Sequence, residues 1–385
     1  MFLTIISFII VLSLLVFVHE LGHFISARKF GVKTEEFGFG LPPRIWGFYK
    51  SKSGKWKHVK GGQEADDAAD TVYSLNWLPI GGFVKIKGED GFEDGEKDNV
   101  NNKPVWQRMI IMSAGVFMNI VLAAVLFSIG FMFGLPQGVD DIDERAIVSE
   151  EKVQIVEVLP ESPAEEAGLK MADAILSVNG IKIDSDTDLQ DITHANIDQE
   201  LSYEVMRGNE KMQLKITPRA NEEGKGEIGI AIINTGLVRY PWYLAVWKGL
   251  KTSIIMVWLI IVAFYELIKG IFVGQGVPAS ISGPVGIAVL AGQFAEMGFV
   301  YLLQFTALLS INLAVINFLP FPALDGGRVI FLLIEKIKGS PIKREVEAVI
   351  HNTGFLLLLL LILVVTVRDV SKFTDKFIAL WQKIF

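Results

Sequence analysis

Three residues near the N-terminus have the types and the spacing of a metal-dependent hydrolase centre. They are His19, Glu20 and His23, in the order H-E-x-x-H. Residues four positions apart lie on one face of an α-helix, so both imidazoles can reach the same metal ion. Glu20 can then take a proton from a water molecule that the metal activates. The motif therefore predicts a metal ion held by the two histidines, with Glu20 as the general base.

Short motifs also occur by chance, and the simplest alternative is an interfacial helix end without function. The surroundings of the motif argue against that alternative. Residues 2–18 are apolar except for three hydroxyl-bearing side chains, and ionisable groups beside a membrane span are costly and usually functional. The chain has no cysteine, so a transition-metal site must use histidine, aspartate or glutamate. Zinc sites normally have a third protein ligand, for which Asp325 is the candidate.

The composition indicates an integral membrane protein. Of the 385 residues, 51% are hydrophobic, and the apolar residues are clustered into long stretches. The first stretch lacks the basic start and the small-residue cleavage site of a signal peptide, so we interpret it as a retained membrane span. Four spans are expected, at about residues 2–30, 105–134, 299–319 and 345–367.

Basic residues predict the orientation of these spans. Arg28 and Lys29 follow the first span, and no lysine or arginine precedes it, so the N-terminus is expected outside and the motif near the cytoplasmic face. By parity, the acidic segment 135–239 is expected outside. Basic residues from Arg328 onward follow the third span, which should therefore run from outside to inside. Asp325 then reaches the depth of the two histidines, although this stretch is also compatible with a simple helix-breaking turn.

The segment 245–272 is apolar in its middle, with charged residues on both sides. A crossing there would reverse the direction of the third span, so we expect an interfacial or re-entrant segment. The Gly/Pro-rich stretch 273–286 would then return the chain.

Two other segments have the pattern of β-structure. In 71–88, Gly81-Gly82 follows Pro79 and precedes alternating apolar and basic residues. We expect a β-hairpin that is apolar enough to enter the membrane edge, or alternatively a small surface hairpin. In 135–239 the pattern predicts a strand at 153–159, a short helix ended by Gly168, a turn at Asn179-Gly180 and two strands around 207–209.

Several stretches together resemble a known family. They are HELGH at 19–23, LPIGGFVK at 78–85, SGPVGIA at 282–288 and NFLPFPALDGG at 317–327. With them the chain resembles the site-2 protease family, and more closely the bacterial regulator of sigma-E protease group of intramembrane zinc metalloproteases. Residues 162–183 also resemble a bacterial PDZ domain, which implies binding of a peptide end or loop by strand addition.

The resemblance implies Zn²⁺ as cofactor, with His19, His23 and Asp325 as ligands and Glu20 as catalytic base. The 317–327 segment would hold an unwound substrate, and the hairpin would be membrane-re-entrant and offer a strand edge to that substrate. The implied substrate-binding residues are Asn317, Pro320, Pro322, Gly81, Gly82 and Phe83. The chain departs from its relatives in having one PDZ-like domain where the best-known relative has two, and Gly115-Val116 where they usually have Gly-Pro.

We therefore expect an α-helical integral membrane protein with four transmembrane helices, a membrane-re-entrant β-hairpin and an inserted extracytoplasmic PDZ-like α/β domain. Its expected parts are an N-terminal membrane core (1–134), the PDZ-like domain (135–239), an interfacial or re-entrant segment (240–298) and a C-terminal membrane core (299–385).

The expected function is that of an intramembrane zinc metalloendopeptidase in the bacterial inner (cytoplasmic) membrane. It would cleave single-span membrane proteins, such as an anti-sigma factor or a remnant signal peptide, in regulated intramembrane proteolysis. The lipid bilayer is an expected partner and nucleic acid is not. One alternative is a non-catalytic PDZ-containing membrane adaptor. Another is a membrane-tethered zinc protease that acts on soluble peptides.

Overall fold

The computed structural model describes residues 2–89, 96–139, 142–171, 173–208, 210–221, 224–274 and 283–372. The chain divides into two compact units. Unit 1 consists of Met1–Leu126, Leu250–Glu296 and Phe305–Phe385, and unit 2 of Phe127–Gly249 and Met297–Gln304. Unit 2 thus contains the end of one long helix and the beginnings of two others in addition to the 135–239 segment.

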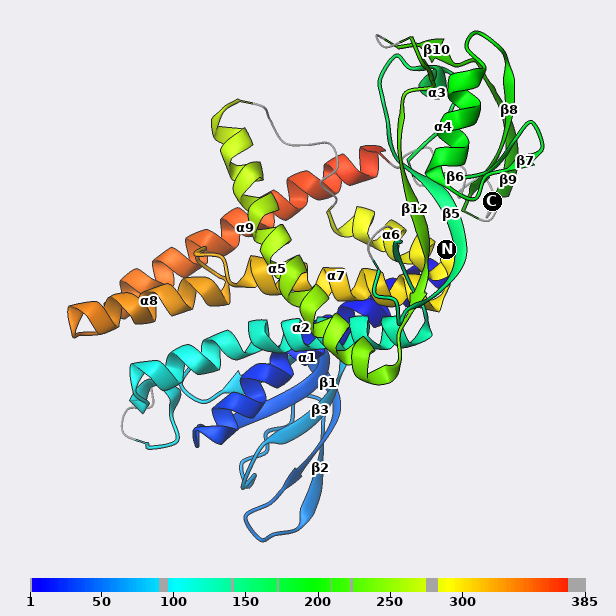
Figure 1. Ribbon diagram of the computed structural model, residues 1–385. Helices are drawn as coiled ribbons and strands as arrows, with labels where there is room; N and C mark the ends of the chain where they lie inside the picture. The colour runs from blue at the N-terminus through cyan, green and yellow to red at the C-terminus, as the bar shows by residue number, and fades with distance from the viewer. Residues whose placement is uncertain are drawn as a thin grey trace, which may run out of the picture. The chain divides into compact units, whose positions relative to one another are not determined.

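Five helices among the described residues are long and apolar enough to cross a membrane. They are α1 (Phe2–Lys29), α2 (Val105–Phe133), α5 (Trp242–Phe272), α7 (Phe299–Asn317) and α9 (Arg344–Lys372) (Figure 1). Helices of this length extend roughly 28–46 Å, against a hydrocarbon core of about 30 Å. Many of their large apolar side chains are exposed, as expected where lipid replaces water as the solvent. The chain is a membrane protein with several apolar helices.

The segment predicted to be interfacial or re-entrant belongs to α5, which is one helix of 31 residues. The interfacial or re-entrant position of this helix stays a prediction. The flanking lysines and glutamate do not interrupt the helix, because both residue types are good helix formers. Of the stretch predicted to return the chain, residues 275–282, including Ser282 of the SGPVGIA stretch, lie outside the described residues.

Unit 1 is held together by close helix packing. A Cβ atom at Gly22 of α1 would overlap the carbonyl oxygen of Ala114 of α2, so the two helices approach closely only because residue 22 is glycine. A buried apolar cluster then joins α1, α2, β3 and the short helix α8 (Asp325–Lys338). Its members are Ala27, Val32, Ile86, Val100, Ile111, Met112, Val329 and Leu332. This cluster places the start of α8 close to α1.

The predicted hairpin at 71–88 is wrong in its pairing. The segment forms one bent strand, β3 (Val72–Ile86), in a three-stranded sheet with β1 (Thr34–Lys50) and β2 (Trp56–Lys60), in the order β2-β1-β3. The two arms of β3 do not pair with each other, because β1 lies between them: Phe37 has both Tyr73 and Val84 as partners. Local alternation reveals a strand but not its partner, since the inserted strand lies more than 30 residues away in sequence.

The bend of β3 packs against the middle of α1. Ser13 Oγ donates a hydrogen bond to the Pro79 carbonyl oxygen (2.6 Å). Gly81 has a φ of +82°, which favours glycine, and a Cβ atom there would meet the Val16 side chain. The bend therefore lies about one helical turn before His19 along α1.

Unit 2 contains a seven-stranded antiparallel sheet in the order β4-β12-β5-β6-β8-β9, with β7 paired to β6, and a small β10-β11 pair. Its core is apolar, with Ile175, Val178 and Tyr203 fully buried. The strands are β4 (Leu135–Gly138), β5 (Ile147–Val158), β6 (Ala174–Val178), β7 (Ile181–Lys182), β8 (Leu201–Arg207), β9 (Glu210–Ile216), β10 (Arg219–Ala220), β11 (Gly226–Glu227) and β12 (Ile230–Arg239). The helices are α3 (Pro163–Glu166) and α4 (Asp186–Ala195).

Most of the local structure predicted for this unit is confirmed. The predicted strand is β5, Gly168 follows α3 with a φ of +83°, and Asn179-Gly180 connects β6 to β7. The strands around 207–208 are β8 and β9. Helix α4 was not predicted, although Ser185 and Asp188 form a capping box at its start.

Candidate metal centre

His19 and His23 lie one turn apart on the buried face of α1, with 6% and 7% of their surfaces exposed. Their ring centroids are 4.9 Å apart, and the two Nε2 atoms are separated by 3.2 Å. The i, i+4 spacing thus brings two ring nitrogens to one point, as the motif predicts.

Asp325, the first residue of α8, completes a His–His–Asp trio. Its Oδ2 lies 3.0 Å from His19 Nε2 and 3.5 Å from His23 Nε2. Four ligands at zinc bond lengths of about 2.0–2.2 Å are separated from one another by about 3.3–3.6 Å in a tetrahedron. The three observed separations are close to that spacing. Asp325 Oδ2 is also buried and lacks a hydrogen bond of acceptable geometry within the described part of the chain. The donor types, their spacing and this unpaired oxygen all fit a zinc ion.

The loop between α7 and α8 holds Asp325 in place. Gly326 and Gly327 sit directly under this loop, where Cβ atoms would overlap the carbonyl oxygens of Phe318 and Phe321. Ala323 has a φ of +79°, which is rare for a residue with a side chain. Its N–H donates to His351 Nδ1 of α9 (3.0 Å). The carboxylate position thus depends on two glycines and on a histidine from the last helix.

Helix α2 forms the wall behind the two histidines. His23 Nδ1 lies 2.8 Å from the carbonyl oxygen of Ile111, and a Cβ atom at Gly115 would overlap atoms of both rings. Asn119 Nδ2 lies 3.3 Å from His19 Nδ1. These three residues are spaced by four and share one helix face. From sequence alone, Gly115 indicates close helix packing, and Asn119 indicates a helix–helix hydrogen bond or, alternatively, the positioning of a ligand. Their common spacing from Ile111 was the signal that could have connected them to the motif.

Glu20 is half-buried beside the trio. Its electrostatic neighbours are His19, His23, Asp325 and Glu89, and Glu89 itself forms an ion pair with Arg328 of α8. Its role as general base stays a prediction.

The predicted substrate-binding residues lie at the end of α7, in the loop that follows it, and in β3. Asn317 is the last residue of α7, and Pro320 and Pro322 lie in the loop that leads to Asp325. Gly82, in the bend of β3, lies against Phe17 of α1. Gly81 and Phe83 flank Gly82 in the same strand. The substrate role of these residues stays a prediction.

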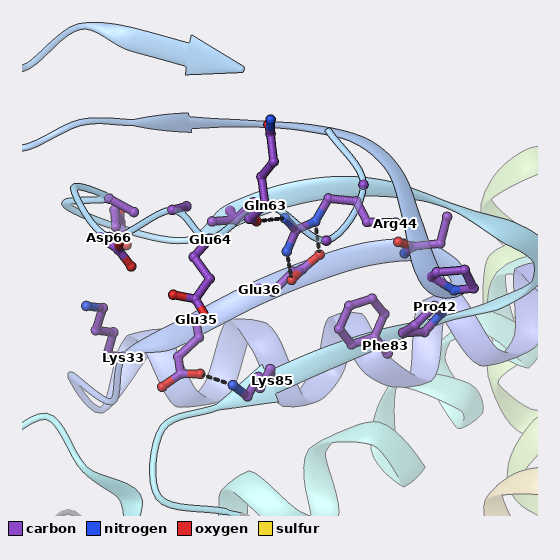
Figure 2. A pocket seen from close by; sticks show the side chains of 18 of the residues that line it. Lys33, Glu35, Glu36, Pro42, Arg44, Gln63, Glu64, Asp66, Phe83 and Lys85 are labelled. Carbon is purple, nitrogen blue, oxygen red and sulfur yellow. Dashed lines mark hydrogen bonds and ion pairs between the residues drawn. The ribbon is translucent and has the colours of Figure 1, made fainter. Parts of the chain in front are cut away.

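A separate cavity of about 750 Å³ lies on the β1–β3 sheet, and its lining includes none of the trio (Figure 2). Arg44 and Glu36 form an ion pair in its wall, with Arg44 Nε donating to Glu36 Oε1 (2.9 Å). Lys85 pairs with Glu35 (2.6 Å). Because these charges neutralise one another instead of converging on one point, they offer no ligand set comparable to the trio.

Comparison with known proteins identifies the family. A model of Peptidase family M50 matches residues 7–59 and 64–361. The chain belongs to peptidase family M50. This M50 chain is 32% identical to the regulator of sigma-W protease RasP of Bacillus subtilis, over 96% of this chain and 98% of that protein. It is 29% identical to the zinc metalloprotease RasP of Geobacillus kaustophilus, again over 96% and 98%. The resemblance to the site-2 protease family is confirmed.

Among solved structures, this M50 chain is similar to the PDZ domain of the SdrC-like protein of Listeria monocytogenes. The identity is 22%, the match covers 22% of this chain and 92% of that domain, and the TM-score is 0.21. At that TM-score the likeness does not establish the fold of unit 2. The PDZ-like prediction depends on the sequence pattern of residues 162–183.

Proposed function

We propose that this protein is an intramembrane zinc metalloendopeptidase that cleaves the transmembrane segments of single-span membrane proteins. The observation that carries the proposal is the His–His–Asp trio, whose ligand atoms lie 3.0–3.5 Å apart between apolar helices. Membership of the M50 family supports peptide hydrolysis, and the relative named a zinc metalloprotease supports zinc as the metal.

Each residue of the centre has a distinct role. His19 and His23 would hold zinc through Nε2, and Asp325 through Oδ2. Zinc, when bound, acts as a Lewis acid on water and on the scissile carbonyl group. Glu20 takes the proton of the attacking water and delivers it to the leaving amine. Asn317 donates a hydrogen bond to the substrate backbone. Because the trio is buried among helices, these charges act in surroundings of low dielectric, where they are stronger than in water.

A transmembrane substrate is a helix, and its peptide bonds become accessible only when that helix unwinds. The exposed N–H and C=O groups then need partners, because lipid offers none. The 82–86 arm of β3 is the last strand in the sheet order, and its outer edge can pair with an extended segment. The bend before it exposes 66% of Trp77 and 50% of Leu78, which supports contact with lipid. The loop with Pro320 and Pro322 leads directly to Asp325 of the trio.

Four of the five apolar helices cross the membrane in this proposal. The trio requires α1 and α7 to run in the same direction, because His23 lies near the end of α1 and Asp325 follows α7. Helix α2 runs the opposite way, since Ile111 meets His23 and Asn119 meets His19. The chain between α2 and α7 therefore crosses an even number of times.

Among the described residues, α5 and the short helix α6 (Pro284–Met297) are the apolar helices between them. With 14 residues, α6 extends about 21 Å, less than the hydrocarbon thickness. Gly292 of α6 also packs against Thr4, at the N-terminal end of α1. If α6 does not cross, parity requires that α5 does not cross either. An interfacial position of α5 follows, with α1, α2, α7 and α9 as the four spans.

The orientation follows from charge. Arg28 and Lys29 at the end of α1 favour the cytoplasmic side, which puts the trio near the cytoplasmic face of a bacterial inner membrane. Unit 2 would then be extracytoplasmic and bind a peptide end or loop through its PDZ-like domain. Similarity to the relative named regulator of sigma-W protease supports an anti-sigma factor as substrate. A remnant signal peptide offers the same chemistry.

The test combines zinc analysis with cleavage by the purified full-length protein. Wild type should bind one zinc per chain, Asp325→Ala should lose it, and the exposed control Asp184→Ala should keep it. Glu20→Gln should keep zinc and lose about 10²- to 10⁴-fold in cleavage rate. Wild type should cut a single-span substrate but not a soluble peptide of the same flanking sequence.

Different outcomes exclude different parts of the proposal. Undetectable zinc together with absent cleavage in wild type leaves only a peptide-binding membrane adaptor. Undiminished cleavage by Glu20→Gln would instead remove Glu20 from the role of general base. Equal cleavage of the soluble peptide instead identifies a membrane-tethered protease.

A further inference from the structure

The two histidines of the trio differ in what holds their second ring nitrogen. His23 Nδ1 faces the Ile111 carbonyl oxygen at 2.8 Å. A carbonyl oxygen only accepts hydrogen bonds, so Nδ1 of His23 must carry the proton. The lone pair of its Nε2 is then directed toward the trio and free to bind a metal.

His19 has the opposite arrangement. Its Nδ1 faces Asn119 Nδ2, which is a donor, at 3.3 Å. In a neutral ring this would put the proton on Nε2, the atom that points at Asp325, and would block metal binding there. Asn119 is 0% exposed, and its Oδ1 has no hydrogen-bond partner in the part of the chain that the structure describes. A buried acceptor without a partner costs about 1–3 kcal/mol.

One rotation removes both conflicts. The oxygen and nitrogen of a carboxamide exchange places when the group turns by half a circle, and their assignment has to follow the hydrogen-bond network. After the turn, Asn119 Oδ1 accepts from His19 Nδ1–H. Both histidines then have the same tautomer, with Nδ1 bound to α2 and Nε2 directed at the metal.

We infer that Asn119 is a positioning residue of the metal centre, which sets the tautomer and the ring orientation of His19. The inference rests on the proposed function. Metal-bound histidines usually donate their other N–H to an oxygen acceptor, and Ile111 already supplies that acceptor for His23. Asn119 supplies it for His19 two turns further along the same face of α2.

The hydrogen bond between α2 and α7 at this position does not require this side chain. The bond between α2 and α7 at this position runs from Ser310 Oγ to the backbone carbonyl oxygen of Asn119 (2.7 Å). Any residue at 119 retains that carbonyl group. What only the asparagine supplies is the carboxamide that faces His19.

The experiment measures the zinc dissociation constant of the purified full-length protein by competition with a chromophoric chelator. Asn119→Leu fills the site but cannot accept a hydrogen bond, and Asn119→Asp can. The Leu variant should bind zinc about 10- to 100-fold more weakly than wild type, and the Asp variant at least as tightly as wild type. The absorption spectrum of the Co²⁺-substituted protein should differ from that of wild type in Asn119→Leu and match that of wild type in Asn119→Asp.

The control variant is Asn312→Ala, which removes a membrane-helix asparagine whose Nδ2 donates to Leu308 within its own helix. It should bind zinc like wild type. Circular dichroism of each metal-free variant shows whether it is folded.

A folded Leu variant with the wild-type zinc affinity overturns the inference, and so does an Asp variant that binds as weakly as Leu. If Asn119→Leu does not fold, the zinc affinity of Asn119→Asp relative to wild type still tests the inference, and weaker binding by this variant overturns it. This failure differs from failure of the proposed function, in which wild type itself takes up no zinc.

Discussion

The substitution Gly115→Ala gives the sharpest test of the metal centre, because the two histidine rings occupy the space where a side chain at position 115 would lie. In Gly115→Ala the added methyl group would lie 2.7 Å from His19 Cε1 and Nε2, and closer still to His23 Nε2. Ordinary contact begins at 3.4 Å, so the His19 ring would have to withdraw by about 0.7 Å, whereas metal–ligand distances tolerate only about 0.2 Å. The ring cannot stay bound where it is.

The magnitude follows from the cost of overpacking. One extra methyl group in a tightly packed site costs about 1–3 kcal/mol. If that cost falls on the metal-bound state, zinc binding weakens about 5- to 140-fold. The helix itself gains, because alanine is about 1 kcal/mol better than glycine in a helix interior. The substitution should therefore weaken zinc binding without weakening the metal-free fold.

The assay is chelator competition for zinc together with thermal unfolding of the metal-free protein in detergent. The matched control is Val125→Ile, which adds one carbon to an outward-facing residue of the same helix. Gly115→Ala should lose zinc affinity and keep its unfolding midpoint, while the control changes neither. A zinc dissociation constant within about twofold of wild type in folded Gly115→Ala would show that the rings do not depend on this space, and the reasoning would be refuted.

Two further predictions concern other parts of the chain. His351→Ala removes the acceptor of the Ala323 N–H, a loss of about 1 kcal/mol that should weaken zinc binding about fivefold. His194→Ala on α4 is the control, and equal zinc affinity of the two variants would contradict the prediction. In unit 2, burial raises the pKa of Tyr203 above its usual value of about 10, and its hydroxyl lacks a partner among the described residues. The hydroxyl group ionises at a lower pH in the unfolded chain than in the folded one. Its contribution to the free energy of unfolding is therefore fully present below about pH 10 and is lost as the pH rises above that value. Tyr203→Phe should increase the free energy of unfolding of unit 2 by about 1 kcal/mol at pH 7, and so raise its urea midpoint. The decline of stability above pH 10 should be less steep than in wild type. Pulse proteolysis in urea measures both effects, and a lower urea midpoint at pH 7 would contradict the prediction.

The sequence by itself determined what depends on neighbours along the chain. Helical periodicity puts His19 and His23 on one face, a run of apolar residues makes a helix long enough to span, and Asn179-Gly180 makes a turn. Each follows from local backbone geometry and side-chain type. The choice of Asp325 as third partner needed one non-local argument, the charge bias that puts the ends of α1 and α7 on the same side of the membrane.

Only the tertiary structure decided which distant segments meet. It inserted β1 between the arms of β3, made α5 a single helix, and turned Ile111, Gly115 and Asn119 into the wall behind two histidines about 90 residues away. It also brought His351 from the last helix to the loop before Asp325. Strand partners and close helix contacts are selected by the fit of surfaces that are far apart in sequence, and no local pattern of residues encodes that fit.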